Sequence, residues 1–121
     1  MAPRLAKSND ELLRLLMGLR KASRKQEAPI WADIADRLEK PARSWAEVNL
    51  SRIERVAPKG STVLVPGKVL GAGAITHAVT VAAFQFSASS REKIHAAGGK
   101  TVTIKQLIEL APKGTGVKIV S

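Results

Sequence analysis

The stretch Lys40–Gly73, KPARSWAEVNLSRIERVAPKGSTVLVPGKVLGAG, decides the fold that this sequence predicts. Its first half carries apolar residues at helical spacing. Ser44 followed by Glu47 has the form of a capping box, so we expect a helix that starts there and runs to Ala57. Pro58–Gly60 then turns the chain.

A strand and a glycine-rich loop complete this stretch. Thr62–Val65 is a short apolar run that contains β-branched residues, which is typical of a buried strand. Pro66–Gly73 is predicted to be a loop, because proline and glycine interrupt regular structure. A helix, a strand and a loop in succession favour an α/β fold.

Upstream of this stretch, the sequence predicts two helices behind a basic arm. The arm covers residues 1–8, and we expect it to be mobile in the free protein. The first helix is expected to begin near Ser8–Asp10, where Ser or Asn can cap it. Pro29 suits the first turn of a second helix, which Pro41 ends.

Downstream, a helix end, the letters APKG and a strand recur, with Ala57 and Ala111 lying 54 positions apart. The two copies indicate two helix–turn–strand units that feed one sheet. The second half thus alternates strands and helices, and the predicted fold class is α/β with partly parallel strands behind N-terminal helices. Its expected elements are a strand at Val79–Phe86, a helix from Ser87 to Ala97, a strand at Thr101–Thr103, a helix at Ile104–Leu110 and a strand at Val117–Val120.

Charge is the outlier of the composition. The 121 residues carry 20 Lys and Arg against 10 Asp and Glu, a net charge of +10. Residues 1–54 hold 11 basic and 8 acidic residues, whereas residues 55–121 hold 9 basic and 2 acidic ones. A small domain this basic most often binds a polyanion, and nucleic acid is the commonest. We therefore expect one nucleic-acid-binding domain over residues 1–121.

The sequence lacks the residues that several other classes of protein need. The chain has no cysteine, which excludes disulfides and thiolate chemistry. No stretch approaches the roughly 18 apolar residues of a membrane span. Asp10, Glu11 and Arg14 interrupt the N-terminal leucines, so we expect no signal peptide and a cytoplasmic protein without membrane contact. Neither His77 nor His95 has a second histidine or a cysteine at ligand spacing, and we expect no metal site.

The loop predicted around Lys68 does not match a nucleotide-binding motif. A phosphate-binding P-loop requires a glycine where Thr62 stands and a Ser or Thr where Val69 stands, and a dinucleotide motif requires a glycine in place of Thr76. Two interpretations remain open, an RNA-backbone contact and a plain tight turn.

Basic clusters and one tryptophan are the candidate contacts with a nucleic acid. Four cations in six residues exceed what a helix C-terminus needs, which favours a phosphate-facing patch. Trp45 either packs in the core or stacks on a partner. Asp33, Asp36 and Glu39 either form a solvated helix face, or two of them hold a divalent ion or act as an acid–base pair. The candidate phosphate contacts are Arg4, Lys7, Arg20, Lys21, Arg24, Lys25, Lys40, Arg43, Arg52 and Lys68.

Five segments together resemble one family of ribosomal proteins. They are AEVNLSRIERVA (Ala46–Ala57), VLVPGKVLGAG (Val63–Gly73), VTVAAFQFS (Val79–Ser87), KIHAAGG (Lys93–Gly99) and APKG (Ala111–Gly114). The chain resembles the archaeal and eukaryotic L-eighteen-e family of the large ribosomal subunit, which is distantly similar to bacterial L-fifteen. It departs from the family pattern at Ala111, where Asn is expected before proline.

The resemblance implies a structural component of the large ribosomal subunit. Its implied partners are the large-subunit rRNA and neighbouring ribosomal proteins, with no enzymatic step, cofactor or small-molecule substrate. The implied fold is an irregular β-β-α superhelical core behind helices at the N-terminus. The implied location is the cytoplasmic ribosome.

Two alternative functions stay open at this point. In the first, the helix from Pro29 and the helix from Ser44 form a helix-turn-helix that reads DNA through Asn49 and Arg52. In the second, the chain is a small enzyme that acts on a phosphorylated substrate at Lys68, although the same segment offers no base or nucleophile.

Overall fold

A computed structural model describes residues 2–121, with side chains described from residue 10 onward. Helices α1 (Ala2–Gln26) and α2 (Pro29–Leu38) come first, and a 3₁₀ turn at Ala42–Ser44 follows them. Strands and helices then alternate, which confirms the predicted α/β class with N-terminal helices. The elements are β1 (Ala46–Asn49), α3 (Leu50–Val56), β2 (Thr62–Leu70), β3 (Thr80–Phe86), α4 (Ala88–Ala96), β4 (Lys100–Thr103), α5 (Ile104–Leu110) and β5 (Val117–Ile119).

The strands form one sheet in which every described ladder is parallel. Strand β2 lies at its centre, with β3 and then β4 along one edge. The opposite edge of β2 is shared, because β5 pairs with its first residues from Thr62 and β1 pairs with its last residues from Gly67. The two APKG segments therefore feed neighbouring strands of one sheet, as their repetition predicted.

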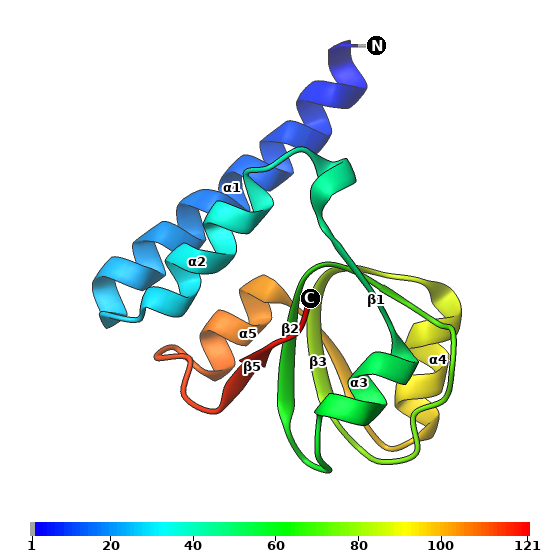
Figure 1. Cartoon of the computed structure of the whole chain (residues 1–121). Coiled ribbons are helices and arrows are strands. Elements are labelled where there is room, and N and C mark those ends of the chain that lie inside the picture. The colour runs from blue at the N-terminus through cyan, green and yellow to red at the C-terminus, as the bar shows by residue number, and fades with distance from the viewer. Residues whose placement is uncertain (1) are drawn as a thin grey trace.

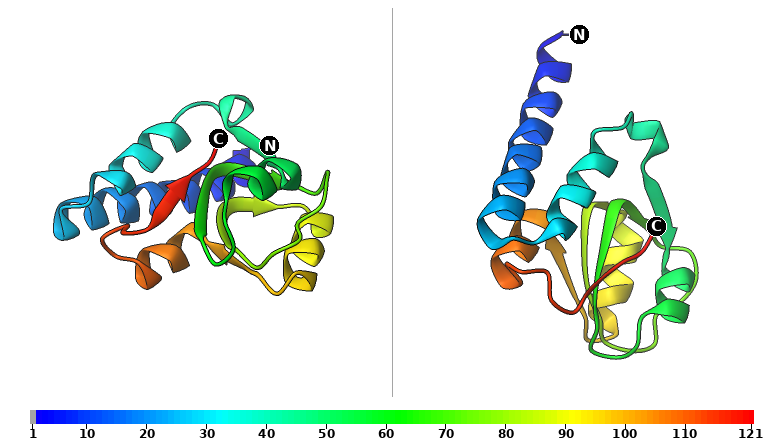
Figure 2. Two further views of the ribbon diagram at one scale, coloured as in Figure 1. Left: turned by 60° about the horizontal axis from the view of Figure 1, so that its bottom comes forward. Right: turned by 60° about the vertical axis from the view of Figure 1, so that its left-hand side comes forward.

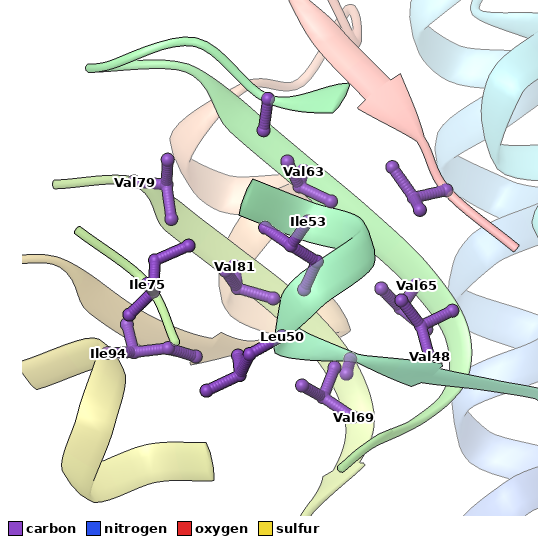
Figure 3. Packing of buried hydrophobic residues seen from close by; sticks show 13 residues of the cluster. Val48, Leu50, Ile53, Val63, Val65, Val69, Ile75, Val79, Val81 and Ile94 are labelled. Carbon is purple, nitrogen blue, oxygen red and sulfur yellow. The ribbon is translucent and has the colours of Figure 1, made fainter. Parts of the chain in front are cut away.

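Helices cover both faces of the sheet (Figures 1 and 2). Helices α3 and α4 lie on one face, where Leu50, Ile53 and Ile94 pack on the valines of β2 and β3 (Figure 3). Helices α1, α2 and α5 lie on the other face. Parallel sheets are characteristically covered on both faces, which explains why β2 reads as a nearly continuous apolar run.

Trp31 anchors α2 in the second of these cores. Its side chain is fully buried, and its indole N–H donates a hydrogen bond of 2.7 Å to the carbonyl oxygen of Pro112. Next to it, Gly114 has a φ of +71°, and a Cβ there would collide with Ile30. The turn before β5 is therefore fixed against α2, and Trp31 is a core residue.

The first helix begins earlier than the sequence predicted. Helix α1 starts at Ala2 rather than near Ser8–Asp10, so it includes residues 2–8 of the expected arm, and Met1 lies outside the described residues. Ala, Leu, Arg and Lys dominate this stretch and favour helices, and Pro3 falls in the first turn, where proline is tolerated. The expected mobility of this stretch stays a prediction.

The predicted capping box at Ser44 and Glu47 is wrong. Ser44 ends the 3₁₀ turn, and Glu47 lies in strand β1. Residues 46–49 pair with residues 67–70 of β2, so tertiary pairing overrides the local signal for a helix. Helix α3 begins only at Leu50, with Asn49 as its N-cap residue.

The predicted loop at Pro66–Gly73 is also wrong in its first half, because β2 continues to Leu70. The register between β2 and β3 shifts between Val65 and Lys68, so β2 contains a bulge at Pro66 and Gly67. A bulge tolerates proline, which has no N–H for the ladder. At Gly67 a Cβ would collide with the carbonyl oxygen of Ala46 and come within 2.9 Å of its amide nitrogen. Glycine is therefore required here for the close approach of β1.

A loop without a helix crosses from β2 to β3 on the α3–α4 face, and side chains of those helices hold it. Lys93 donates to the carbonyl oxygens of Gly71 and Gly73 at 2.8 and 3.0 Å. Glu54 accepts hydrogen bonds from the backbone N–H and the hydroxyl of Thr76. These bonds, with a smaller contribution from nearby His77, hold the pKa of Glu54 below its ordinary value.

We predict that Gly67→Ala destabilises the fold by about 3 kcal/mol, at the upper end for overpacking, because the new methyl group meets backbone atoms of β1. Gly18→Ala is the matched control, since nothing lies within 4 Å of a Cβ added at that helical position. The control should raise stability by about 0.5–1 kcal/mol. Denaturant unfolding of both variants measures the difference, and equal stabilities would contradict the close approach at Gly67.

We also predict a pH-dependent contribution from Glu54. The pKa of Glu54 is lower in the folded state than in the unfolded state, where it is near 4.5. At pH values above 4.5, the ionised carboxylate therefore makes its full contribution to folding stability. This stabilisation is lost as the pH falls through the lower folded pKa. The difference in unfolding free energy between the wild type and Glu54→Gln should therefore shrink on acidification below about pH 4.5. A difference that stays constant with pH would contradict the assignment.

Candidate nucleic-acid interface

Of the four cations at the end of α1, one forms ion pairs with α2 and three do not. Arg20 forms ion pairs with Asp36 at 2.9 Å and Glu39 at 2.8 Å, both at the end of α2 or just beyond it. Hydrogen bonds to Glu39, and then to Asp36, raise the pKa of Arg20 above its ordinary value. Arg20 thus fastens α1 to α2, and its charge is balanced within the protein.

The other three cations of this cluster are exposed. Lys21, Arg24 and Lys25 form no ion pair among the described side chains. Cations in the last turns suit the negative end of the helix dipole, but that effect leaves their charges open to solvent. They form a compact positive surface, which we call the α1 patch (Lys21, Arg24 and Lys25).

Two further candidate cations line a cavity of about 480 Å³, together with the carboxylates Glu11 and Glu47. Lys40, which follows α2, and Lys68, which lies in β2, both line this cavity. The fold therefore brings together two candidates that lie far apart in the sequence. Lys68 is half-buried on a strand and lines this cavity, so the interpretation as a plain tight turn is wrong, whereas an RNA-backbone contact by Lys68 stays a prediction.

Trp45 and Phe84 also line this cavity and pack against each other. Their ring centroids lie 5.0 Å apart at an interplanar angle of 74°, an edge-to-face arrangement. The indole N–H of Trp45 donates to the carbonyl oxygen of Lys40 at 2.9 Å. Trp45 is half-buried against the α1–α2 core, which supports the packing interpretation, and it also lines the cavity.

The remaining candidates are dispersed. Arg43 is exposed in the 3₁₀ turn beside the cavity, and Arg52 is exposed on α3, which covers the opposite face of the sheet. The side chains of Arg4 and Lys7 lie outside the described residues. The fold thus groups Lys21, Arg24 and Lys25 in one place and Lys40 with Lys68 in another, and Arg52 belongs to neither group.

The acidic residues of α2 serve as ion-pair partners. Asp33 pairs with Arg37 at 3.1 Å, and Asp36 and Glu39 bind Arg20. This arrangement supports the solvated helix face over an ion site. In the described part of the chain, no group of three or more His, Asp or Glu side chains is placed to hold a metal ion.

Comparison with known proteins then decides the family. The family model for ribosomal protein 60S L18 and 50S L18e matches residues 2–121. The large ribosomal subunit protein eL18 of Methanoregula boonei is 50% identical over 119 residues, which cover 98% of each chain. The eL18 protein of Halobacterium salinarum is 48% identical over 116 residues, 96% of this chain and 99% of that relative. The chain belongs to the L18/L18e family of large-subunit ribosomal proteins.

More distant members match over the full length as well. The eL18 protein of Methanothermobacter thermautotrophicus is 44% identical over 120 residues, with 99% of each chain covered. The match includes α1, although the sequence segments that carried the resemblance all begin at or after Ala46. Among the described helices, none has the length and apolar character needed to cross a membrane.

The local structure removes the basis of both alternative functions, the DNA-binding helix-turn-helix and the small enzyme. The proposed helix-turn-helix lacks its second helix, because β1 follows the 3₁₀ turn. Asn49, the expected base-reading residue, accepts a hydrogen bond from the backbone N–H of Ala72 at 3.3 Å. The enzyme hypothesis relied on a phosphate loop at Lys68, where the structure has a strand.

Among the residues that line the cavity, Glu47 and Gln85 were not candidates for the site in the sequence. Glu47 was interpreted as part of a capping box. Gln85 did offer a signal, since it is the one polar residue in the run Val81–Phe86.

Proposed function

We propose that this protein is a structural constituent of the large ribosomal subunit and binds folded large-subunit rRNA mainly through backbone phosphates. Its partners are this rRNA and neighbouring ribosomal proteins in the cytoplasmic ribosome, and it carries out no catalytic step. We further propose that residues 1–121 act as a single rRNA-binding domain. Membership of the L18/L18e family supports the place in the subunit, and the distribution of charge supports the mode of binding.

The observation that carries the phosphate-binding proposal is the unbalanced charge of the α1 patch. Its three cations project from the end of one helix without a carboxylate partner among the described side chains. Residues 55–121 add 9 basic residues against 2 acidic ones. Polyanionic RNA supplies the missing counter-charge, and neutralised phosphates release counterions.

The candidate contacts differ in what they offer to RNA. Arg20 is a positioning residue in this proposal, because two carboxylates of α2 already hold its guanidinium. The proposed phosphate contacts are Arg4, Lys7, Lys21, Arg24, Lys25, Lys40, Arg43, Arg52 and Lys68.

We predict that changing Lys21, Arg24 and Lys25 together to Gln weakens binding of purified large-subunit rRNA and flattens its salt dependence. Each phosphate contact contributes roughly 0.7–0.9 to the slope of log K against log salt, so the slope should fall by about 2–3. A variant that exchanges the same residues as Lys21→Arg, Arg24→Lys and Lys25→Arg keeps the charge and should keep the slope. Arg20→Gln alone should also keep it.

Filter binding at several salt concentrations measures these slopes. A triple Gln variant with the slope of the wild type would remove the α1 patch from the proposed interface. The place in the subunit has its own test, which is sedimentation of a cell lysate on a sucrose gradient after a high-salt wash. Stoichiometric retention with the large subunit is expected, and recovery of the protein at the top of the gradient would overturn the proposal.

A further inference from the structure

The cavity beside Lys68 lies where parallel sheets characteristically bind ligands. It opens near the carboxyl ends of β2 and β3, on the face that α1 covers, and has a volume of about 480 Å³. In open α/β sheets, ligands bind in the crevice outside the carboxyl ends of the strands. The wall between α2 and β1 closes the cavity on one side, because Lys40, Pro41 and Trp45 all line it.

A row of polar side chains crosses three strands at this cavity. Glu47 of β1 is in register with Lys68 of β2, which is in register with Gln85 of β3. The same face of the sheet is apolar further back, where Leu64 and Ala82 are fully buried. The carboxylate of Glu47, the ammonium group of Lys68 and the amide of Gln85 therefore lie side by side. Packing of the core does not require polar side chains at these positions.

These three side chains are available to a ligand. None of them donates or accepts a side-chain hydrogen bond, or forms an ion pair, within the described part of the chain. Together they present a hydrogen-bond acceptor, a positive charge and an amide that can both donate and accept. Few but convergent polar groups in a concave site are typical of a small-molecule or nucleotide pocket.

The aromatic pair gives this pocket a rigid wall. Trp45 is fixed by its hydrogen bond to the carbonyl oxygen of Lys40 and by its contact with Phe84. Because the indole N–H is already used, the part of Trp45 that borders the cavity offers ring surface rather than a donor. Aromatic rings beside cations are the usual platform for an unstacked RNA base.

We propose that this pocket receives one unstacked nucleotide of the rRNA, an inference that rests on the proposed function. The base lies against Trp45 and Phe84, and its hydrogen-bonding edge faces Gln85 and Glu47. The phosphate of that nucleotide lies at Lys68. The carboxylate accepts but cannot donate, so the pocket favours a base that carries an exocyclic amino group.

Ultraviolet cross-linking of large subunits tests the position of the base. Irradiated subunits are digested with ribonuclease and trypsin, and the peptides are analysed by mass spectrometry. A nucleotide adduct is expected on the peptide Ser44–Arg52, which contains Trp45. Gln85→Ala should lower its yield, whereas the control Lys59→Gln, an exposed lysine in the turn before β2, should not.

Binding of purified rRNA separates the two kinds of contact. Gln85→Ala should weaken binding about 10-fold without changing the salt slope, because the amide is uncharged. Lys68→Gln should lower the slope by about one contact, roughly 0.7–0.9. Gln85 is exposed, so its variant should keep the thermal unfolding temperature of the wild type.

The outcomes that would overturn the nucleotide pocket differ from those that would overturn rRNA binding itself. If the wild type binds rRNA with a steep salt slope but gives no adduct, and Gln85→Ala binds equally well, the pocket proposal is wrong and the proposed function stands. A lysine-reactive cross-link from Lys68 to another protein, without a nucleotide adduct, would assign the cavity to a protein neighbour. A wild type that does not bind rRNA would overturn both proposals.

Discussion

The pairing of strand β2 along both of its edges is the constraint on which the rest of this structure depends. Its nine residues face β3 on one side, while β5 and β1 divide the other side between them. Such a strand has no free edge, and both faces are covered by helices, so its side chains must be apolar almost throughout. Strand β2 has its bulge at Pro66 and Gly67. Because Gly67 has no side chain, the backbone of β1 at Ala46 can lie close to β2 at this point.

The burial of β2 also determines where charged side chains can lie. In the described part of the chain, the sheet and its two cores leave cations on the outer helix surfaces, in the turns, on the outer strands and at the open end of the sheet. The carboxylates of α2 are used to hold Arg20 and Arg37, so they do not neutralise the α1 patch. A fold of this size thus keeps an unbalanced positive surface at one end of α1 and a mixed polar row at the end of β2.

Apart from the early start of α1, the errors of sequence reasoning lie at β1 and in the second half of β2. Ser44 and Glu47 have the spacing of a helix start, and Pro66 and Gly67 have the composition of a loop. Both signals are local, and both are overridden by hydrogen bonds between residues 46–49 and residues 67–70. Pairing between segments that lie about twenty residues apart leaves no periodicity in either segment, so the candidate site at Lys68 was placed in a loop instead of a cavity wall.

The sequence by itself determined the elements whose cause is local. Pro29 at the start of α2, Ser87 as the N-cap of α4 and the left-handed glycine Gly98 after α4 all follow from side-chain or backbone chemistry of neighbouring residues. The net charge also follows from composition, and it supports the proposed class of partner. Only the tertiary structure decided which strands adjoin, that Arg20 is balanced by α2 while Lys21 is not, and that Glu47, Lys68 and Gln85 share one cavity. Those facts depend on long-range contacts, and no short segment of the chain encodes them.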